Sequence, residues 1–146
     1  MEKGQEGWTF DLSAPSYAPF MKFSARRDLR KKLYEAYNTR AVGGDSDNTE
    51  VVKEIAGLRL QIANILGYPT YADYALEERM AKSQETVNAF LSDLMQKSLP
   101  AAKAEVASIQ KYAEAHGFGD KLQSWDFSYW ANRYKEENYS ISDELL

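Results

Sequence analysis

The stretch that decides the fold is residues 7–40, GWTFDLSAPSYAPFMKFSARRDLRKKLYEAYNTR. It contains no histidine, no cysteine and no cluster of carboxylates, so it offers little chemistry of its own. Pro15 suits the start of a helix, and Pro19 follows within the first turn, where a missing N–H costs little. We therefore expect a first helix from about Pro15 and a second helix from an N-cap at Ser24 to about Arg40.

The second predicted helix is amphipathic, with apolar residues at helical spacing. Its apolar face comprises Leu29, Leu33, Ala36 and Tyr37. We place Arg26, Arg30 and Lys31 on the opposite, solvated face. A dense basic run can bind phosphate, but on this acidic chain a solvated helix face is the better interpretation. Arg27 is a candidate for pairing with an acidic partner in a larger protein.

A glycine-rich break at residues 43–47 precedes a third predicted helix, which is capped by Asp47 or Asn48 and ends at Gly67. Its predicted buried stripe consists of Val51, Val52, Ile55, Leu58, Ile62, Ile65 and Leu66. Pro69 prevents continuation of that helix. Thr70 then caps a short helix that runs to about Arg79.

The longest helical pattern runs from a cap at Ser83 to His116, with Pro100 predicted to kink it. Its apolar stripe comprises Val87, Phe90, Leu91, Leu94, Val106, Ile109 and Tyr112. As one helix it spans about 51 Å, whereas a globule of this size has a diameter of about 38 Å. We expect an elongated molecule. Ser124 caps a last helix, and residues 142–146 resemble the first turn of another, cut off before its body.

Composition limits the function classes. The chain has 146 residues, of which 44% are hydrophobic, so it is one folded domain or a piece of one. Its net charge of −4 argues against nucleic acid as a partner. No run approaches the length of a membrane span, and residues 1–7 lack the apolar core of a signal peptide. The absence of cysteine fits cytoplasm or periplasm; we predict a cytoplasmic protein and keep the periplasm as an alternative.

No residue qualifies as a catalytic, cofactor-binding or metal-binding site. His116 is the only histidine, whereas a helical zinc peptidase needs two on one face plus a further ligand. Its position beside Gly117 suits a helix C-terminus better. Asp45 and Asp47 resemble the start of a calcium loop, but Glu50 replaces the required glycine, so a solvated turn is favoured.

Other polar and aromatic groups also have ordinary interpretations. The adjacent acidic pairs at residues 77–78, 136–137 and 143–144 diverge by about 100° on a helix, so they do not converge on a substrate. Residues 138–140 form a glycosylation sequon of low specificity. The aromatic set is Trp125, Phe127, Tyr129, Trp130, Tyr134 and Tyr139. It suits packing better than a peptide groove.

The ordered set of segments resembles the thimet oligopeptidase and peptidyl-dipeptidase family of zinc metallopeptidases. The matching segments are GWTFDL, PSYAPFM, SARRDLRKKLYEAYNTRA, NTEVVKEIAGLRLQIANILGY, YADYALEERMA and WDFSYWANRYK, together with the long Pro-containing helix. They occur in the family's order across nearly the whole chain. The bacterial peptidyl-dipeptidase branch is the most similar by this comparison.

This resemblance implies an all-α, channel-forming peptidase fold in which residues 1–146 are one helical fragment upstream of the zinc motif. The family's H-E-x-x-H motif and distal Glu ligand match no residue here. Zinc and short peptide substrates therefore belong to the parent enzyme, and we predict that this fragment binds no zinc and catalyses nothing. Faces that pack on the missing catalytic domain favour self-association of the fragment. The alternative is an independent helical module that binds a protein or peptide.

Overall fold

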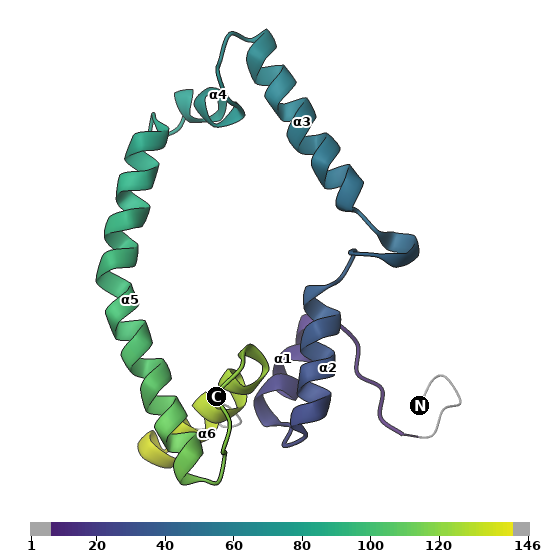
Figure 1. Cartoon of the computed structure of the whole chain (residues 1–146), viewed down its shortest axis with the longest axis vertical. Helices are drawn as coiled ribbons and strands as arrows, with labels where there is room; N and C mark the ends of the chain where they lie inside the picture. The colour runs from purple at the N-terminus through teal and green to yellow at the C-terminus, as the bar shows by residue number, and fades with distance from the viewer. Residues whose placement is uncertain (1–6, 142–146) are drawn as a thin grey trace. The chain divides into compact units, whose positions relative to one another are not determined.

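The computed structural model describes residues 7–141, and within that range it contains helices and no strand. The helices are α1 (Ala14–Phe23), α2 (Arg27–Asn38), α3 (Thr49–Ile65), α4 (Tyr71–Glu77), α5 (Gln84–Ala115) and α6 (Ser124–Tyr139), with a 3-10 turn η1 (Gly44–Ser46) between α2 and α3 (Figure 1). The predicted all-α class is confirmed. The helical turn predicted at residues 142–146 lies outside the described residues.

The chain divides into two compact units. Among the described residues, unit 1 contains 7–40 and 104–141, and unit 2 contains 41–103. In unit 1, α1 and α2 both contact α6, while α1 also contacts α2 (Figure 1). In unit 2, α3 contacts α4. Helix α5 contributes to both units, because the division falls after Lys103.

The boundary between α1 and α2 corrects one sequence prediction. Ser24 is the C-cap of α1, with its N–H bonded to the Phe20 carbonyl, and the N-cap of α2 is Arg26. The Ser24 hydroxyl accepts a hydrogen bond from the Arg26 N–H at 3.3 Å. Ser24 therefore shapes the turn between the two helices rather than opening α2. Pro19 also lies further into α1 than predicted, since the helix begins at Ala14.

The predicted ends of α3 and the predicted start of α4 are confirmed, and α4 ends at Glu77, two residues before the predicted end. Asn48 occupies the N-cap of α3 without a side-chain hydrogen bond to the helix. Gly67 has a φ of 85°, which a side chain would make costly, and its N–H bonds to the Asn64 carbonyl. Thr70 caps α4 in a capping box with Asp73, in which each side chain accepts from the other residue's backbone N–H.

Helix α5 continues through Pro100 without interruption, which confirms the predicted long helix. The predicted kink at Pro100 stays a prediction. Gly117, with a φ of 85°, follows its end. Helix α6 begins at Ser124, and its N-cap is Gln123 rather than the predicted Ser124.

Unit 1 has a core built on α5 and α6. Ile109, Ala113 and Trp130 are buried together. Half-buried aromatic and apolar side chains pack around them: Tyr112, Phe118, Leu122, Tyr129, Ala131 and Tyr134. Trp130, Tyr129 and Tyr134 of the aromatic set therefore serve as packing, as the sequence favoured. Phe127 and Tyr139 are exposed.

Unit 2 contradicts the predicted buried stripe of α3. All seven stripe residues are exposed, and among the described residues of this unit only Ala63 is buried. The periodicity was correct, but a periodic apolar face becomes buried only when another element covers it, and here α4 covers a different side of α3. The stripe of α5 is also buried only in part. Ile109 is buried, whereas Phe90, Leu91 and Leu94 in unit 2 and Val106 in unit 1 are exposed.

Candidate functional site

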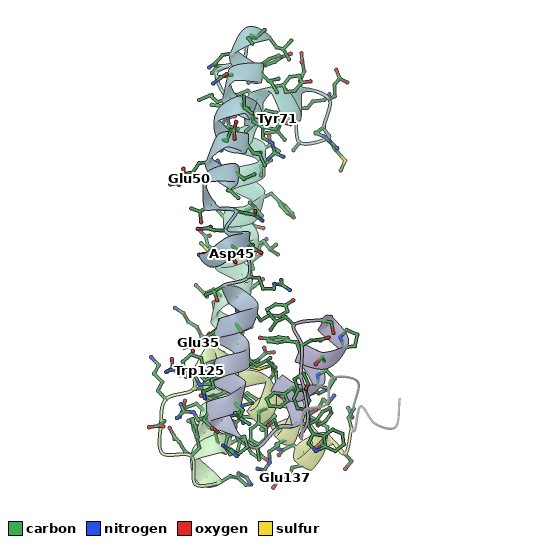
Figure 2. All side chains as sticks on the ribbon, turned by 90° about the vertical axis from the view of Figure 1, so that its right-hand side faces the viewer. Glu35, Asp45, Glu50, Tyr71, Trp125 and Glu137 are labelled. Atoms are coloured by element: carbon green, nitrogen blue, oxygen red, sulfur yellow. The ribbon has the colours of Figure 1, made fainter. Side chains whose placement is uncertain are left out.

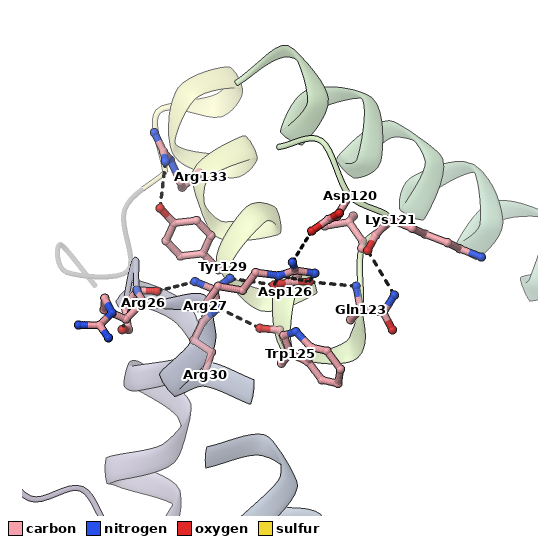
Figure 3. A network of polar contacts seen from close by, with 12 residues as sticks. Arg26, Arg27, Arg30, Asp120, Lys121, Gln123, Trp125, Asp126, Tyr129 and Arg133 are labelled. Carbon is pink, nitrogen blue, oxygen red and sulfur yellow. Dashed lines mark hydrogen bonds and ion pairs between the residues drawn. The ribbon is translucent and has the colours of Figure 1, made fainter. Parts of the chain in front are cut away.

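The most developed polar site of unit 1 is a buried cluster of two arginines and an aspartate. Arg27 and Arg30 lie one turn apart in α2, and Asp126 lies in the first turn of α6. Arg30 and Asp126 are the largest fully buried side chains, at 1% and 0% exposure. Figure 3 shows how both guanidinium groups converge on the one carboxylate.

The geometry uses every acceptor position of that carboxylate. Its Oδ1 accepts from Arg30 Nη2 at 2.9 Å and from Arg27 Nε at 3.0 Å. Its Oδ2 accepts from Arg27 Nη2 at 3.0 Å and from the Gln123 backbone N–H at 3.2 Å. The positive end of the α6 dipole adds to this stabilisation of the charge.

Two further donors of Arg30 bond to backbone carbonyls. Its Nε donates to the Trp125 carbonyl at 3.0 Å, and its Nη1 donates to the Ser24 carbonyl at 2.7 Å (Figure 3). Its guanidinium lies 4.4 Å from the centre of the Tyr129 ring. The prediction that Arg30 faces solvent is therefore wrong, because Arg30 is buried in an ion pair with Asp126 of α6.

Arg27 has the acidic partners that the sequence assigned to a larger protein, and they lie within this chain. It pairs with Asp126 and also with the exposed Asp120. The hydrogen bond to Asp126 raises the pKa of Arg27 above its already high ordinary value. Because its arginines lie on α2 and its aspartate lies on α6, the cluster clamps the two helices together.

A second feature of unit 1 is an open cavity of about 440 Å³ between α1 and α6. Tyr17, Met21 and Phe127 supply apolar lining, and Lys22 and Lys135 also line it. Asn132, another lining residue, is buried, and its Oδ1 has no hydrogen-bond partner, although its Nδ2 donates to Glu136 at 2.8 Å. Such a lining suits an apolar group that carries a hydrogen-bond donor.

His116 lies at the end of α5, as its position beside a glycine predicted. Its Nδ1 is 2.8 Å from the Tyr112 carbonyl, and its Nε2 is 3.3 Å from a Glu137 carboxylate oxygen. Glu137 also accepts a short hydrogen bond from the Tyr112 hydroxyl. Partial burial, followed by this bond, raises the pKa of Tyr112 to about 12. Both ring nitrogens of His116 thus have partners within the chain.

The candidates resembling a calcium loop form a turn before α3. The Asp47 carboxylate accepts from the Thr49 N–H at 2.9 Å and from its hydroxyl at 2.6 Å. These bonds hold the pKa of Asp47 below its ordinary value. Asp45 and Glu50 lie on separate elements, η1 and the first turn of α3 (Figure 2). The carboxylates therefore do not gather around a common point.

The described residues do not fit a protein zinc site. Among residues 7–141, no group of three or more His, Cys, Asp or Glu side chains is placed to hold a metal ion. The chain has one histidine and no cysteine, so a His-based ligand set is also excluded by composition.

Only a weak local signal in the sequence points to the arginine cluster. Arginines at positions i and i+3 share a helix face, which is a hint of a common partner. The partner carboxylate, however, lies 96 residues from Arg30 in the sequence, within an aromatic-rich helix.

No helix between residues 7 and 141 is long and apolar enough to span a membrane.

Comparison with known proteins places this helical assembly among the metallopeptidases. The sequence model of Peptidase family M3 matches residues 20–146. The chain therefore belongs to peptidase family M3, which confirms the resemblance drawn from the ordered segments.

Individual relatives share between a quarter and two fifths of their aligned residues with this chain. Oligopeptidase A of Escherichia coli strain K12 is 38% identical over 149 residues, covering 99% of this chain and 22% of the relative. The probable cytosolic oligopeptidase A of Arabidopsis thaliana is 36% identical over 141 residues, covering 95% and 20%. The dipeptidyl carboxypeptidase of Escherichia coli strain K12 is 29% identical over 147 residues, covering 99% and 22%.

The chain thus spans about one fifth of the length of these relatives. The identities also correct one expectation. The chain is more similar to oligopeptidase A than to dipeptidyl carboxypeptidase, at 38% against 29%, so the preference for the peptidyl-dipeptidase branch is wrong.

Proposed function

We propose that residues 1–146 form one non-catalytic helical piece of a zinc metallopeptidase that hydrolyses short peptides. In this proposal the chain supplies part of the wall or scaffold of a substrate channel. The zinc ligands and the general base belong to a catalytic domain outside this chain, and the parent enzyme is cytoplasmic. Family membership supports the peptidase assignment, and the short span of the relatives supports a partial role.

One observation carries the non-catalytic assignment. The single histidine of the chain is engaged by the Tyr112 carbonyl and by Glu137, and no second histidine or cysteine can complete a zinc site. A helical zinc peptidase needs ligands that converge on one face of a helix, with an open position for water. The cluster around Asp126 offers neither, because it contains no histidine and both carboxylate oxygens of Asp126 accept hydrogen bonds from the arginines.

The test is a chimera in which this chain replaces the aligned segment of Escherichia coli oligopeptidase A. We expect the chimera to cleave a quenched fluorescent peptide in the presence of zinc, whereas residues 1–146 alone cleave nothing. Zinc-dependent hydrolysis by the isolated chain would overturn the non-catalytic assignment. A folded chimera without activity would count against the scaffold role.

The α1–α6 cavity supports a second candidate, an independent module that binds peptides or protein segments. This candidate predicts that the isolated chain binds a short apolar peptide, and that Phe127→Ala, in the cavity lining, weakens the binding. Calorimetric titration of the isolated chain checks it. The scaffold proposal expects no saturable binding in that titration.

A further inference from the structure

Helix α3 carries an exposed apolar seam with a regular spacing. The seam consists of Val51, Ile55, Leu58, Ile62 and Ile65, at intervals of four, three, four and three residues. The exposed fractions of these side chains run from 43% to 83%. At about 100° per residue, the five positions fall within an arc of about 80° on the helix surface.

Helix α4 leaves this seam open. It packs on the flank of α3 where Ala63 is fully buried and where the Tyr71 ring lies 5.4 Å from the Arg59 guanidinium. Those two α3 positions lie about 80–120° around the helix from the seam centre. Leu60 lies on the opposite side of α3 from the seam, about 180° away, and its exposed fraction of 45% is close to the 47% of Ile62.

The spacing of the seam residues indicates that the element covering them is a helix. An alternation of four and three residues is the pattern by which one helix packs its side chains into the holes of another. A strand or an irregular loop does not match it. Glu54 borders the seam on the side away from α4, so the matching helix presents a basic residue near Glu54.

We propose that an amphipathic helix from the part of the family M3 polypeptide outside this chain covers the Val51–Ile65 seam. This inference rests on the proposed function. About four fifths of the length of the relatives lies outside the aligned region, which is ample chain to supply such a helix. Unit 2 has no covering of its own, since among its described residues only Ala63 is buried.

The experiment compares matched substitutions in the oligopeptidase A chimera described above. Ile62→Glu places a charge in the seam, and Leu60→Glu places the same charge on the opposite face at equal exposure. We expect Ile62→Glu to lower the yield of folded chimera at least about tenfold, because a buried unpaired charge is costly. We expect Leu60→Glu to change it by less than about twofold. Ile62→Ala, which adds no charge, gives a smaller loss of the same sign.

Hydrogen exchange supplies a measurement that does not depend on activity or on a variant. The amides of α3 should exchange at least about 100-fold more slowly in the unsubstituted chimera than in residues 1–146 alone, because covering the seam stabilises the helix. Equal exchange in the two proteins would overturn the inference, as would equal effects of Ile62→Glu and Leu60→Glu.

The outcomes separate this inference from the proposed function. A folded chimera with protected α3 amides but no peptidase activity overturns the proposed function and supports the seam. An active chimera with unprotected α3 amides does the reverse. Sedimentation of the isolated chain tests whether a second copy of the chain covers the seam instead. That result would be a dimer with protected α3 amides, which Ile62→Glu dissociates and Leu60→Glu does not.

Discussion

Units 1 and 2 contain similar amphipathic helices but differ in how much they bury. Within its described residues, unit 1 buries three apolar side chains in one cluster and an arginine with its aspartate. Unit 2 buries only Ala63 among its described residues. Amphipathic spacing therefore identifies the apolar face of a helix. Whether that face is buried depends on whether another segment packs against it.

The contacts of unit 1 join distant parts of the sequence, and those of unit 2 are mostly local. Arg30 and Asp126 are 96 residues apart. The hydrogen bonds of unit 2 include Gln84 to Thr70 and Thr70 to Asp73, which join residues 14 and 3 positions apart. We therefore expect substitutions in unit 1 to change the stability of the chain, and substitutions in unit 2 to have local effects.

The largest effect is predicted for Asp126→Ala. It leaves Arg30 buried without its carboxylate, which costs about 3–5 kcal/mol of unfolding free energy. The matched control is Asp28→Ala, which removes an ion pair to Arg26 whose side chains are 56% and 69% exposed. Solvent screens that pair, so we expect a far smaller loss of stability. Urea unfolding followed by tryptophan fluorescence measures both, and equal shifts in midpoint would contradict the contrast.

The next prediction compares isoleucines from the two units. Ile109→Ala in the unit 1 core should cost about 2–5 kcal/mol, because it removes buried methyl groups and leaves a cavity. Ile55→Ala on the exposed α3 seam should change the stability of the isolated chain by less than about 0.5 kcal/mol. Thermal unfolding followed by circular dichroism measures both. A large loss from Ile55→Ala would show that the isolated chain covers its own seam.

A smaller effect is predicted for Thr70→Ala at the start of α4. The variant loses the cap that accepts from the Asp73 N–H, at a cost of about 0.5–2 kcal/mol to α4. Hydrogen exchange of the α4 amides measures the loss. Asn48→Ala is the control, since Asn48 occupies the α3 N-cap without a side-chain cap bond; comparable losses at both positions would contradict the assigned role of Thr70.

The smallest effect concerns the pH dependence of the same cap. Hydrogen bonding from Thr70, and then from Gln84, holds the pKa of Asp73 below its ordinary value. Because the folded pKa is depressed, the stabilising effect is present above the unfolded pKa, near 3.9, and is lost as pH falls through the folded pKa. A carboxyl NMR titration should show a higher Asp73 pKa in Thr70→Ala, and a smaller rise in Gln84→Ala.

The sequence predicted the parts of the fold that depend on local chemistry. The cap at Thr70 and the left-handed glycines at residues 67 and 117 follow from the residue types at those positions, and the structure confirms them. The ordered segments also identified the family correctly.

The sequence could not predict which faces are buried. Arg30 resembled a solvated residue because its neighbours are basic, and only the approach of α6 reveals its partner. The α3 stripe resembled a core because it is periodic, yet no described segment covers it. In both cases the deciding contact is non-local, and a single sequence carries no direct record of such contacts.

The continuity of α5 has a consequence for the order of folding. Starting a helix is unfavourable, whereas extending one is nearly neutral or favourable. The unit 1 core holds the last turns of α5 through Ile109 and Ala113, so it supplies a nucleus for a helix that extends back into unit 2. Pro100 lies between that nucleus and the unit 2 half and removes one hydrogen-bond donor. We therefore expect Pro100 to hinder the growth of α5 toward unit 2, so that the residues before Pro100 become helical later than those after it.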